Sequence, residues 1–184
     1  MYYGFSYCSG HYYYINAAGS GNGTFVSYID SNGVHAAVWN DFAEYRKSNI
    51  IEPGRVVVED INDTMVLATE RLQPCAKIIS DTFGMSVGKS DKANTPIGVA
   101  GRVLAYTYQN RNNYHIGDCV CSAPNGTVDI MSREEIKEFP DRIIGIVSQI
   151  PDYELWENTI TDSFGYTSKS TPIEVKNRIW IYVK

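Results

Sequence analysis

Two carboxylates, Asp41 and Glu44, stand three residues apart in an aromatic stretch, and together they could carry out acid–base chemistry. Trp39, Phe42 and Tyr45 lie beside them. Apolar surroundings disfavour the charged form of a carboxylate, so one buried member of the pair could stay neutral while the other is ionised. The neutral acid could then protonate a peptide nitrogen while its partner activates a nucleophile. The alternative is structural: Asp41 as a turn or cap residue and Glu44 as an ion-pair partner.

The elements that must position this pair are predicted to be strands. A hairpin is expected over residues 24–40, because Asn32-Gly33 supplies the positive φ angles of a tight turn between runs of β-branched and aromatic residues. Asp41 then lies at the end of a strand. The stretch 41–47 is compatible with either a helix or a strand.

The lead before this hairpin, residues 1–23, is rich in tyrosine, glycine and serine. Aromatic rings left in water forfeit a large burial area, so these side chains are expected to pack against another subunit or to bind a host-surface glycan by stacking. A further aromatic excursion is expected at 151–170. The candidate partner or glycan contacts are Tyr2, Tyr3, Tyr12, Tyr13, Tyr14 and Trp156.

After residue 49 the sequence repeats itself. Residues 51–70 align without a gap on 114–133, and each half reads as glycine, strand, short turn, strand. The ends also match, with 95–108 on 171–184 sharing Thr, Pro, Ile, Val, Arg and Tyr. One such unit would leave strand edges and an apolar face exposed, so the two are expected to form one body with pseudo-twofold symmetry.

The predicted fold is therefore mainly β: a duplicated β-unit forming a barrel- or sandwich-like body with one short helix, preceded by a β-hairpin and an aromatic arm. The predicted domains are 1–40 and 41–184, with the repeats at about 51–108 and 114–184. Between the matching ends, Phe83-Gly84-Met85 is taken to correspond to Ile144-Gly145-Ile146. The helix is expected at 132–139, where Ser132 and Glu135 have the spacing of a capping box.

Composition restricts the partners. The formal net charge is -5 and the basic residues form no stripe, so nucleic acid is not expected. No apolar run approaches the roughly 20 residues of a membrane span. Motifs for a cofactor or a metal ion are also missing, and the four cysteines are expected to be free thiols.

Several motifs together resemble one family. These are Trp-Asn-Asp-Phe-Ala-Glu-Tyr at 39–45, Pro53-Gly54 followed by valines, Arg102-Val103, and Arg-Ile-Trp-Ile at 178–181. They resemble the C-terminal domain of bacteriophage neck and tail appendage proteins, a trimerising intramolecular chaperone that in many members cuts itself off. The resemblance implies a homotrimer made in the bacterial host cytoplasm and assembled with other virion proteins.

The resemblance also implies a cut between Asn40 and Asp41, with Asp41 and Glu44 as the catalytic carboxylates. The best-known members have a small hydroxyl residue where this chain has Asn40, and an asparagine could instead cyclise through its side-chain amide. Only forty residues precede the bond. The expected function is therefore a structural one in the virion, a trimerising β module for assembly or attachment of capsid, tail or fibre parts. The alternatives are a self-cleaving chaperone and a glycan-binding module.

Overall fold

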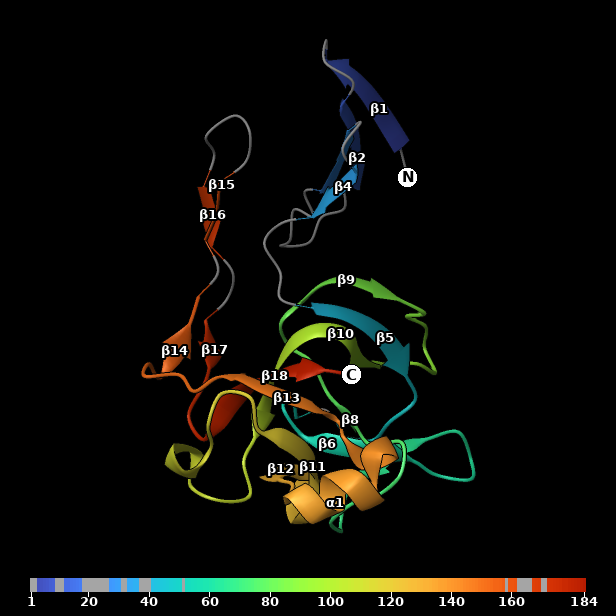
Figure 1. Ribbon diagram of the computed structural model, residues 1–184. Coiled ribbons are helices and arrows are strands. Elements are labelled where there is room, and N and C mark those ends of the chain that lie inside the picture. Colours follow the sequence, from blue (N-terminus) through green and yellow to red (C-terminus); the bar gives the residue numbers. More distant parts are fainter. Residues whose placement is uncertain are drawn as a thin grey trace. The chain divides into compact units, whose positions relative to one another are not determined.

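The chain divides into two compact units, residues 1–39 with 157–171 and residues 40–156 with 172–184 (Figure 1). Each unit is described separately. The computed structural model describes the backbone of residues 3–8, 12–17, 27–30, 33–36, 41–50, 52–157, 159–161, 167–169 and 172–184. Side chains are described for residues 41–50, 52–84, 86–157 and 172–184.

The first unit contains a four-stranded antiparallel sheet in the order β1-β2-β3-β4. Its strands are β1 (Tyr3–Cys8), β2 (Tyr12–Ala17), β3 (Ser27–Asp30) and β4 (Gly33–Ala36). The pairing of β3 with β4 confirms the predicted hairpin, and its register sets Asp30 opposite Gly33. The aromatic lead supplies two further strands, in which Tyr7 pairs with Tyr13. A separate hairpin is formed by β15 (Thr159–Thr161) and β16 (Thr167–Lys169).

The second unit has two main sheets. The larger has the strand order β12-β11-β13-β18-β10-β5-β9, and the smaller has the order β7-β6-β8. The strands are β5 (Asp41–Arg46), β6 (Val56–Glu59), β7 (Met65–Leu67), β8 (Lys77–Ile78), β9 (Phe83–Val87), β10 (Thr95–Tyr106), β11 (Cys119–Ala123), β12 (Thr127–Ile130), β13 (Gly145–Gln149), β14 (Leu155–Trp156), β17 (Ile173–Glu174) and β18 (Arg178–Val183). The helices are α1 (Arg133–Glu138) and the short 3-10 helices η1 (Arg111–Asn113), η2 (Pro124–Gly126) and η3 (Pro140–Arg142).

The main hydrophobic core lies between these two sheets. The smaller sheet contributes Val56, Val58 and Ile78, and the larger sheet contributes buried residues of β10, β11, β12, β13 and β18. Among the described strands no barrel closes, so the body is sandwich-like. Mainly β architecture with one short α-helix is thus confirmed. Burial of this alternating apolar set is the main force that holds the sheets together.

The duplication recurs in the backbone hydrogen bonds. β6 and β7 of the first half correspond to β11 and β12 of the second, and β8 corresponds to β13. Three bonds of each half occupy equivalent positions at 2.8 to 3.0 Å: Gly54 N–H to Ile79 O and Gly117 N–H to Val147 O, Ile79 N–H to Arg55 O and Val147 N–H to Asp118 O, Ala68 N–H to Val56 O and Met131 N–H to Cys119 O. Gly54 and Gly117 also share a positive φ, 86° and 97°.

The pseudo-twofold axis passes between β10 and β18 at the pair Leu104 and Trp180. These strands pair antiparallel, with Arg102 opposite Tyr182 and Tyr106 opposite Arg178. The sequence repeat sets Arg102 on Arg178 and Tyr106 on Tyr182, so each cross-strand pair is the image of the other. The central pairing of the sheet therefore has the symmetry that the repeat predicts.

One part of the predicted repeat is wrong. Phe83-Gly84-Met85 lies in β9, which pairs in parallel with β5 at the edge of the larger sheet. Ile144-Gly145-Ile146 leads into β13, whose structural equivalent is β8, where Lys77 rather than Gly84 corresponds to Gly145. The two segments match in sequence because both enter apolar strands, but their partners differ.

Helix α1 is capped as its sequence predicts. The Ser132 hydroxyl accepts the Glu135 N–H, and the Glu135 carboxylate accepts the Ser132 N–H at 2.8 Å. Glu135 also accepts two bonds from the Arg71 guanidinium, at 2.7 and 2.8 Å, and Arg71 reaches Asp129 at 2.5 Å. A side chain of the first repeat thus ties α1 and β12 of the second repeat together.

Candidate functional site

Asp41 is the first residue of β5 and is 8% exposed. β5 pairs with β10 on one side and with β9 on the other, so the strand that carries Asp41 is not at the edge of the sheet. The Thr82 hydroxyl donates to Asp41 Oδ1 at 2.7 Å, whereas Asp41 Oδ2 is buried and has no partner among the described residues. Gly98 lies beside this oxygen: a Cβ there would lie 3.6 Å from Asp41 Oδ2, an ordinary contact, and 2.5 Å from Val103 Cγ2, which would have to move. The site therefore contains a buried acid with one uncommitted oxygen.

Burial raises the pKa of Asp41 from 3.8 to about 6. Hydrogen bonds from Thr82 and Ser80 favour the ionised form and oppose the shift, while the nearby charge of Asp81 adds to it. Desolvation is the largest of these effects. Asp41 is thus able to hold or release a proton close to neutral pH.

Glu44 lies on the same strand but on the opposite face. Successive side chains of a strand alternate between its faces, so residues three apart point to opposite sides. Accordingly Asp41 and Ala43 are buried whereas Glu44 is exposed. Within the described chain the two carboxylates do not converge on one site, and the geometry of a paired acid and base is not formed.

The two arginines considered as ion-pair partners of Glu44, Arg46 and Arg55, pair with other carboxylates. Arg46 pairs with Glu59 and with Asp63, the latter at 2.7 Å. Arg55 pairs with Glu52 at 2.9 Å. Among the described residues Glu44 therefore forms no ion pair of its own, although its charge contributes to raising the pKa of Arg46.

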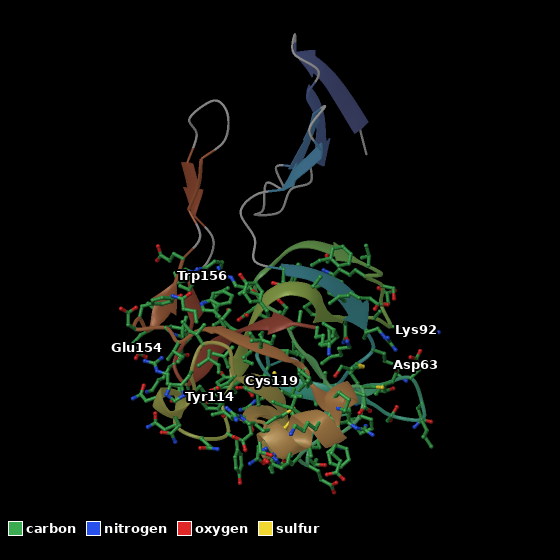
Figure 2. All side chains as sticks on the ribbon, viewed as in Figure 1. Asp63, Lys92, Tyr114, Cys119, Glu154 and Trp156 are labelled. Carbon is green, nitrogen blue, oxygen red and sulfur yellow. The ribbon has the colours of Figure 1, made fainter. Side chains whose placement is uncertain are left out.

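Trp156 is half-buried and packs edge-on against Trp180, with ring centroids 5.5 Å apart. Trp180 in turn donates its indole N–H to the Tyr153 hydroxyl at 2.9 Å. Figure 2 shows Trp156 at β14, which pairs with β17. This ring belongs to a small apolar cluster over the larger sheet, so much of it is already used in packing.

The other candidate contacts lie in the first unit. Tyr3, Tyr12, Tyr13 and Tyr14 are in β1 and β2, whose backbone alone is described, and Tyr2 lies outside the described residues. The glycan-contact hypothesis for these tyrosines stays a prediction.

The sequence analysis missed the partners of Asp41. Ser80, Asp81 and Thr82 form a polar run between the apolar strands β8 and β9, and all three bear on Asp41. A polar triplet between two apolar runs is a usable signal of a buried network. Its contact with Asp41 depends on the parallel pairing of β5 with β9, which local sequence does not specify.

Searches against models of protein families, curated proteins and solved structures found no match for this chain. Within the described part of the chain, no cluster of three or more His, Cys, Asp or Glu side chains is arranged to hold a metal ion. No described helix has the length and apolar character needed to cross a membrane. The site is therefore interpreted from its own geometry.

Replacing Asp41 with asparagine is expected to remove a pH dependence from the stability of the second unit. The folded-state pKa lies above the ordinary value, so the stabilising contribution is complete below pH 3.8 and is lost as the pH rises through about 6. The asparagine variant is therefore expected to be more stable than the natural chain by about 3 kcal/mol near pH 8, with the difference shrinking towards pH 4.

Urea unfolding at fixed protein concentration across this pH range measures the difference. Glu44→Gln is the matched control, because it removes an exposed carboxylate from the same strand, and it is expected to keep the pH profile of the natural chain. An Asp41→Asn profile parallel to that of the natural chain would contradict the assignment of Asp41 as the group responsible.

Proposed function

We propose that the chain is a structural component of a bacteriophage or prophage particle: a homotrimeric β module that assembles or attaches capsid, tail or fibre parts. The observation that carries the proposal is an exposed apolar pair at the centre of the larger sheet. Ile146 on β13 and Tyr182 on β18 stand opposite each other and are 44% and 54% exposed. Apolar side chains at the middle of a sheet are usually covered, so a protein partner is the expected occupant.

The resemblance of residues 39–45 and of the two Arg-containing strands to phage appendage proteins supports the same proposal. The architecture of the second unit also supports the proposal: it is a sandwich-like β body in which the described polar clusters serve packing and ion pairing. We also propose that the protein is made in the cytoplasm of the bacterial host and becomes part of the virion.

Light scattering and sedimentation at micromolar concentration test the assembly. A trimer is expected, and its apparent mass should hold on moderate dilution. A monomer at every concentration would overturn the proposed function. Copurification with virion parts from cells carrying the parent phage or prophage would then identify the partner.

A second candidate function is self-cleavage between Asn40 and Asp41, favoured by the uncommitted Oδ2 of a buried acid whose pKa is raised to about 6. In its neutral form this carboxyl can donate a proton to the departing amide nitrogen of its own residue. The carbonyl carbon of Asn40 is attacked either by water, giving a new carboxylate, or by the Asn40 side-chain nitrogen, giving a cyclic imide. Either way the carbon–nitrogen bond breaks and Asp41 becomes a free amino terminus.

Intact-mass measurement during long incubation distinguishes these outcomes. Cleavage is expected to be faster near pH 5 than near pH 8, because the acid must be neutral, and Asp41→Asn should abolish it. The fragment ending at Asn40 is one water lighter if the asparagine cyclises. An unchanged mass at both pH values rejects self-cleavage by the isolated protein.

A further inference from the structure

A pocket of about 360 Å³ opens on the second unit between the segments 74–77 and 140–143, beside Lys184. Its walls include the apolar side chains of Pro74, Pro140 and Ile143. We call it the cationic pocket, because Lys77, Arg142 and Lys184 line it and Asp141 is the one acidic residue in that lining. A cluster of cations is unexpected on a chain whose formal net charge is -5.

The cations of this pocket are incompletely paired. Arg142 Nε lies 3.1 Å from an Asp141 oxygen, but Arg142 Nη1 is buried and has no partner among the described residues. No described side chain forms an ion pair with Lys77 or Lys184. A buried guanidinium nitrogen without an acceptor costs free energy, so the pocket is suited to an anionic group.

The turn between β6 and β7, residues 59–63, has the opposite character. We call it the acidic tip, because Glu59, Asp60 and Asp63 surround Ile61, which is fully exposed. Figure 2 shows Asp63 at the margin of the second unit.

The acidic tip has a defined shape. Asp60 Oδ1 accepts the backbone N–H groups of Asn62 and Thr64, each at 2.9 Å. Arg46 pairs with Glu59 and Asp63 at the base of the turn, and Lys47 acts on Asp60 and Asp63 from nearby, so the three carboxylates face two cations and Asp60 is the one without an ion pair among the described residues. An isoleucine is therefore held in water by a fixed turn, at a cost in unburied apolar area.

We propose that the acidic tip of one copy inserts into the cationic pocket of a neighbouring copy, as the contact between subunits of the trimer. This inference rests on the proposed function, because it names the surfaces through which that trimer forms. Ile61 would pack against Pro140 and Ile143, and the carboxylates of the tip would face Lys77 and Lys184. The two features complement each other in charge and in apolar character: Ile61 is fully exposed, and neither Lys77 nor Lys184 forms an ion pair with a described side chain.

The two surfaces are different parts of one subunit, so the contact is head to tail. Such contacts form a closed ring when the rotation between neighbours returns to the start, as it does for a trimer. In a closed trimer every acidic tip then inserts into the cationic pocket of a neighbour.

A disulfide cross-link tests the contact, using a cysteine that the chain already has. Cys75 is an exposed, free thiol in the lining of the pocket. In an Ile61→Cys variant, the thiol of the tip of one copy would lie near Cys75 of the next. Diamide takes one hydrogen from each thiol and is reduced to the hydrazine, leaving a disulfide between copies. Covalent dimers and closed trimers are expected on a non-reducing gel.

Two controls keep this test specific. Cys75→Ser in the same variant should abolish the cross-link, and Ile116→Cys, at a site that is 73% exposed on another loop, should give none. A cross-link that persists without Cys75 would show that the tip meets a thiol outside the pocket, and it would overturn the proposal. So would the absence of any cross-link in the Ile61→Cys trimer.

Substitutions measure the strength of the contact. Ile61→Asp is expected to weaken trimer association by about tenfold to a hundredfold, the equivalent of losing one buried isoleucine. Lys77→Glu should weaken it as well, while Ile116→Asp and Lys176→Glu, both on exposed turns, should not. Far-UV circular dichroism checks that each variant is folded.

The failure of this inference is distinguishable from the failure of the proposed function. A natural chain that is monomeric overturns both. A trimer that survives Ile61→Asp but dissociates with Ile146→Asp overturns only the tip-in-pocket contact and transfers the interface to the exposed pair on β13 and β18.

Discussion

Replacing Arg178 with leucine is expected to lower the free energy of unfolding by about 3 to 5 kcal/mol, because it leaves the partner carboxylate of a buried ion pair uncompensated. The Arg178 side chain is 4% exposed and binds both oxygens of Asp81, at 2.7 and 2.9 Å. It also donates to the carbonyls of Leu104 and Glu174, at 3.2 and 3.0 Å. One guanidinium thus joins β18 to β10 and to the loop that precedes β9.

Chemical denaturation of the purified variants measures this loss. Arg178→Leu combined with Asp81→Leu is expected to recover part of the stability, because no unpaired carboxylate remains. Arg133→Leu, an exposed arginine at the start of α1, is the matched control and should change the stability by no more than about 0.5 kcal/mol. A loss below about 1 kcal/mol for Arg178→Leu would contradict the predicted importance of the pair.

Replacing Trp180 with alanine is expected to cost about 3 to 5 kcal/mol, the range for a large aromatic removed from a core. Trp180 is 1% exposed and packs with Leu104 and Val175. The Arg102 guanidinium lies 5.1 Å from its ring centroid, and Trp156 covers its edge. The cavity would open at the pseudo-twofold axis, where the two repeats meet.

Trp156→Ala tests whether the half-buried tryptophan of this cluster contributes less to stability than the buried Trp180. Trp156 is only half-buried, so its removal should cost clearly less than that of Trp180. Near-UV circular dichroism is expected to show loss of the coupled indole signal in both variants. Equal losses of stability for the two would contradict the view that Trp180 is the central residue of this cluster.

The sequence predicted those elements that are determined by residues close together in the chain. The hairpin of β3 and β4 forms where Asn32-Gly33 predicted one, and Ser132 with Glu135 caps a helix through bonds three residues apart. The repeat predicted a body with pseudo-twofold symmetry but not which strands meet at the axis; the structure shows that β10 pairs there with β18.

The predicted site depends on whether residues 41–47 form a helix or a strand, which the local sequence does not determine. Residues three apart share a face in a helix but lie on opposite faces of a strand, so the relation of Asp41 to Glu44 depends on the state of 41–47. Pairing with β10 and with β9 makes this stretch a strand. The same pairing brings Thr82 to Asp41 across forty residues of sequence, which no local pattern predicts.

β18 is translated after every other described strand of the second unit, yet it lies fourth of seven in the larger sheet, between β13 and β10. Until it arrives, those two neighbours are open edges, and Leu104 has no Trp180 to cover it. A ribosome that stops before residue 178 therefore releases a product with two open strand edges, on β13 and on β10, which proteases can recognise. The second unit can therefore close its larger sheet only after residues 178–183 have been translated.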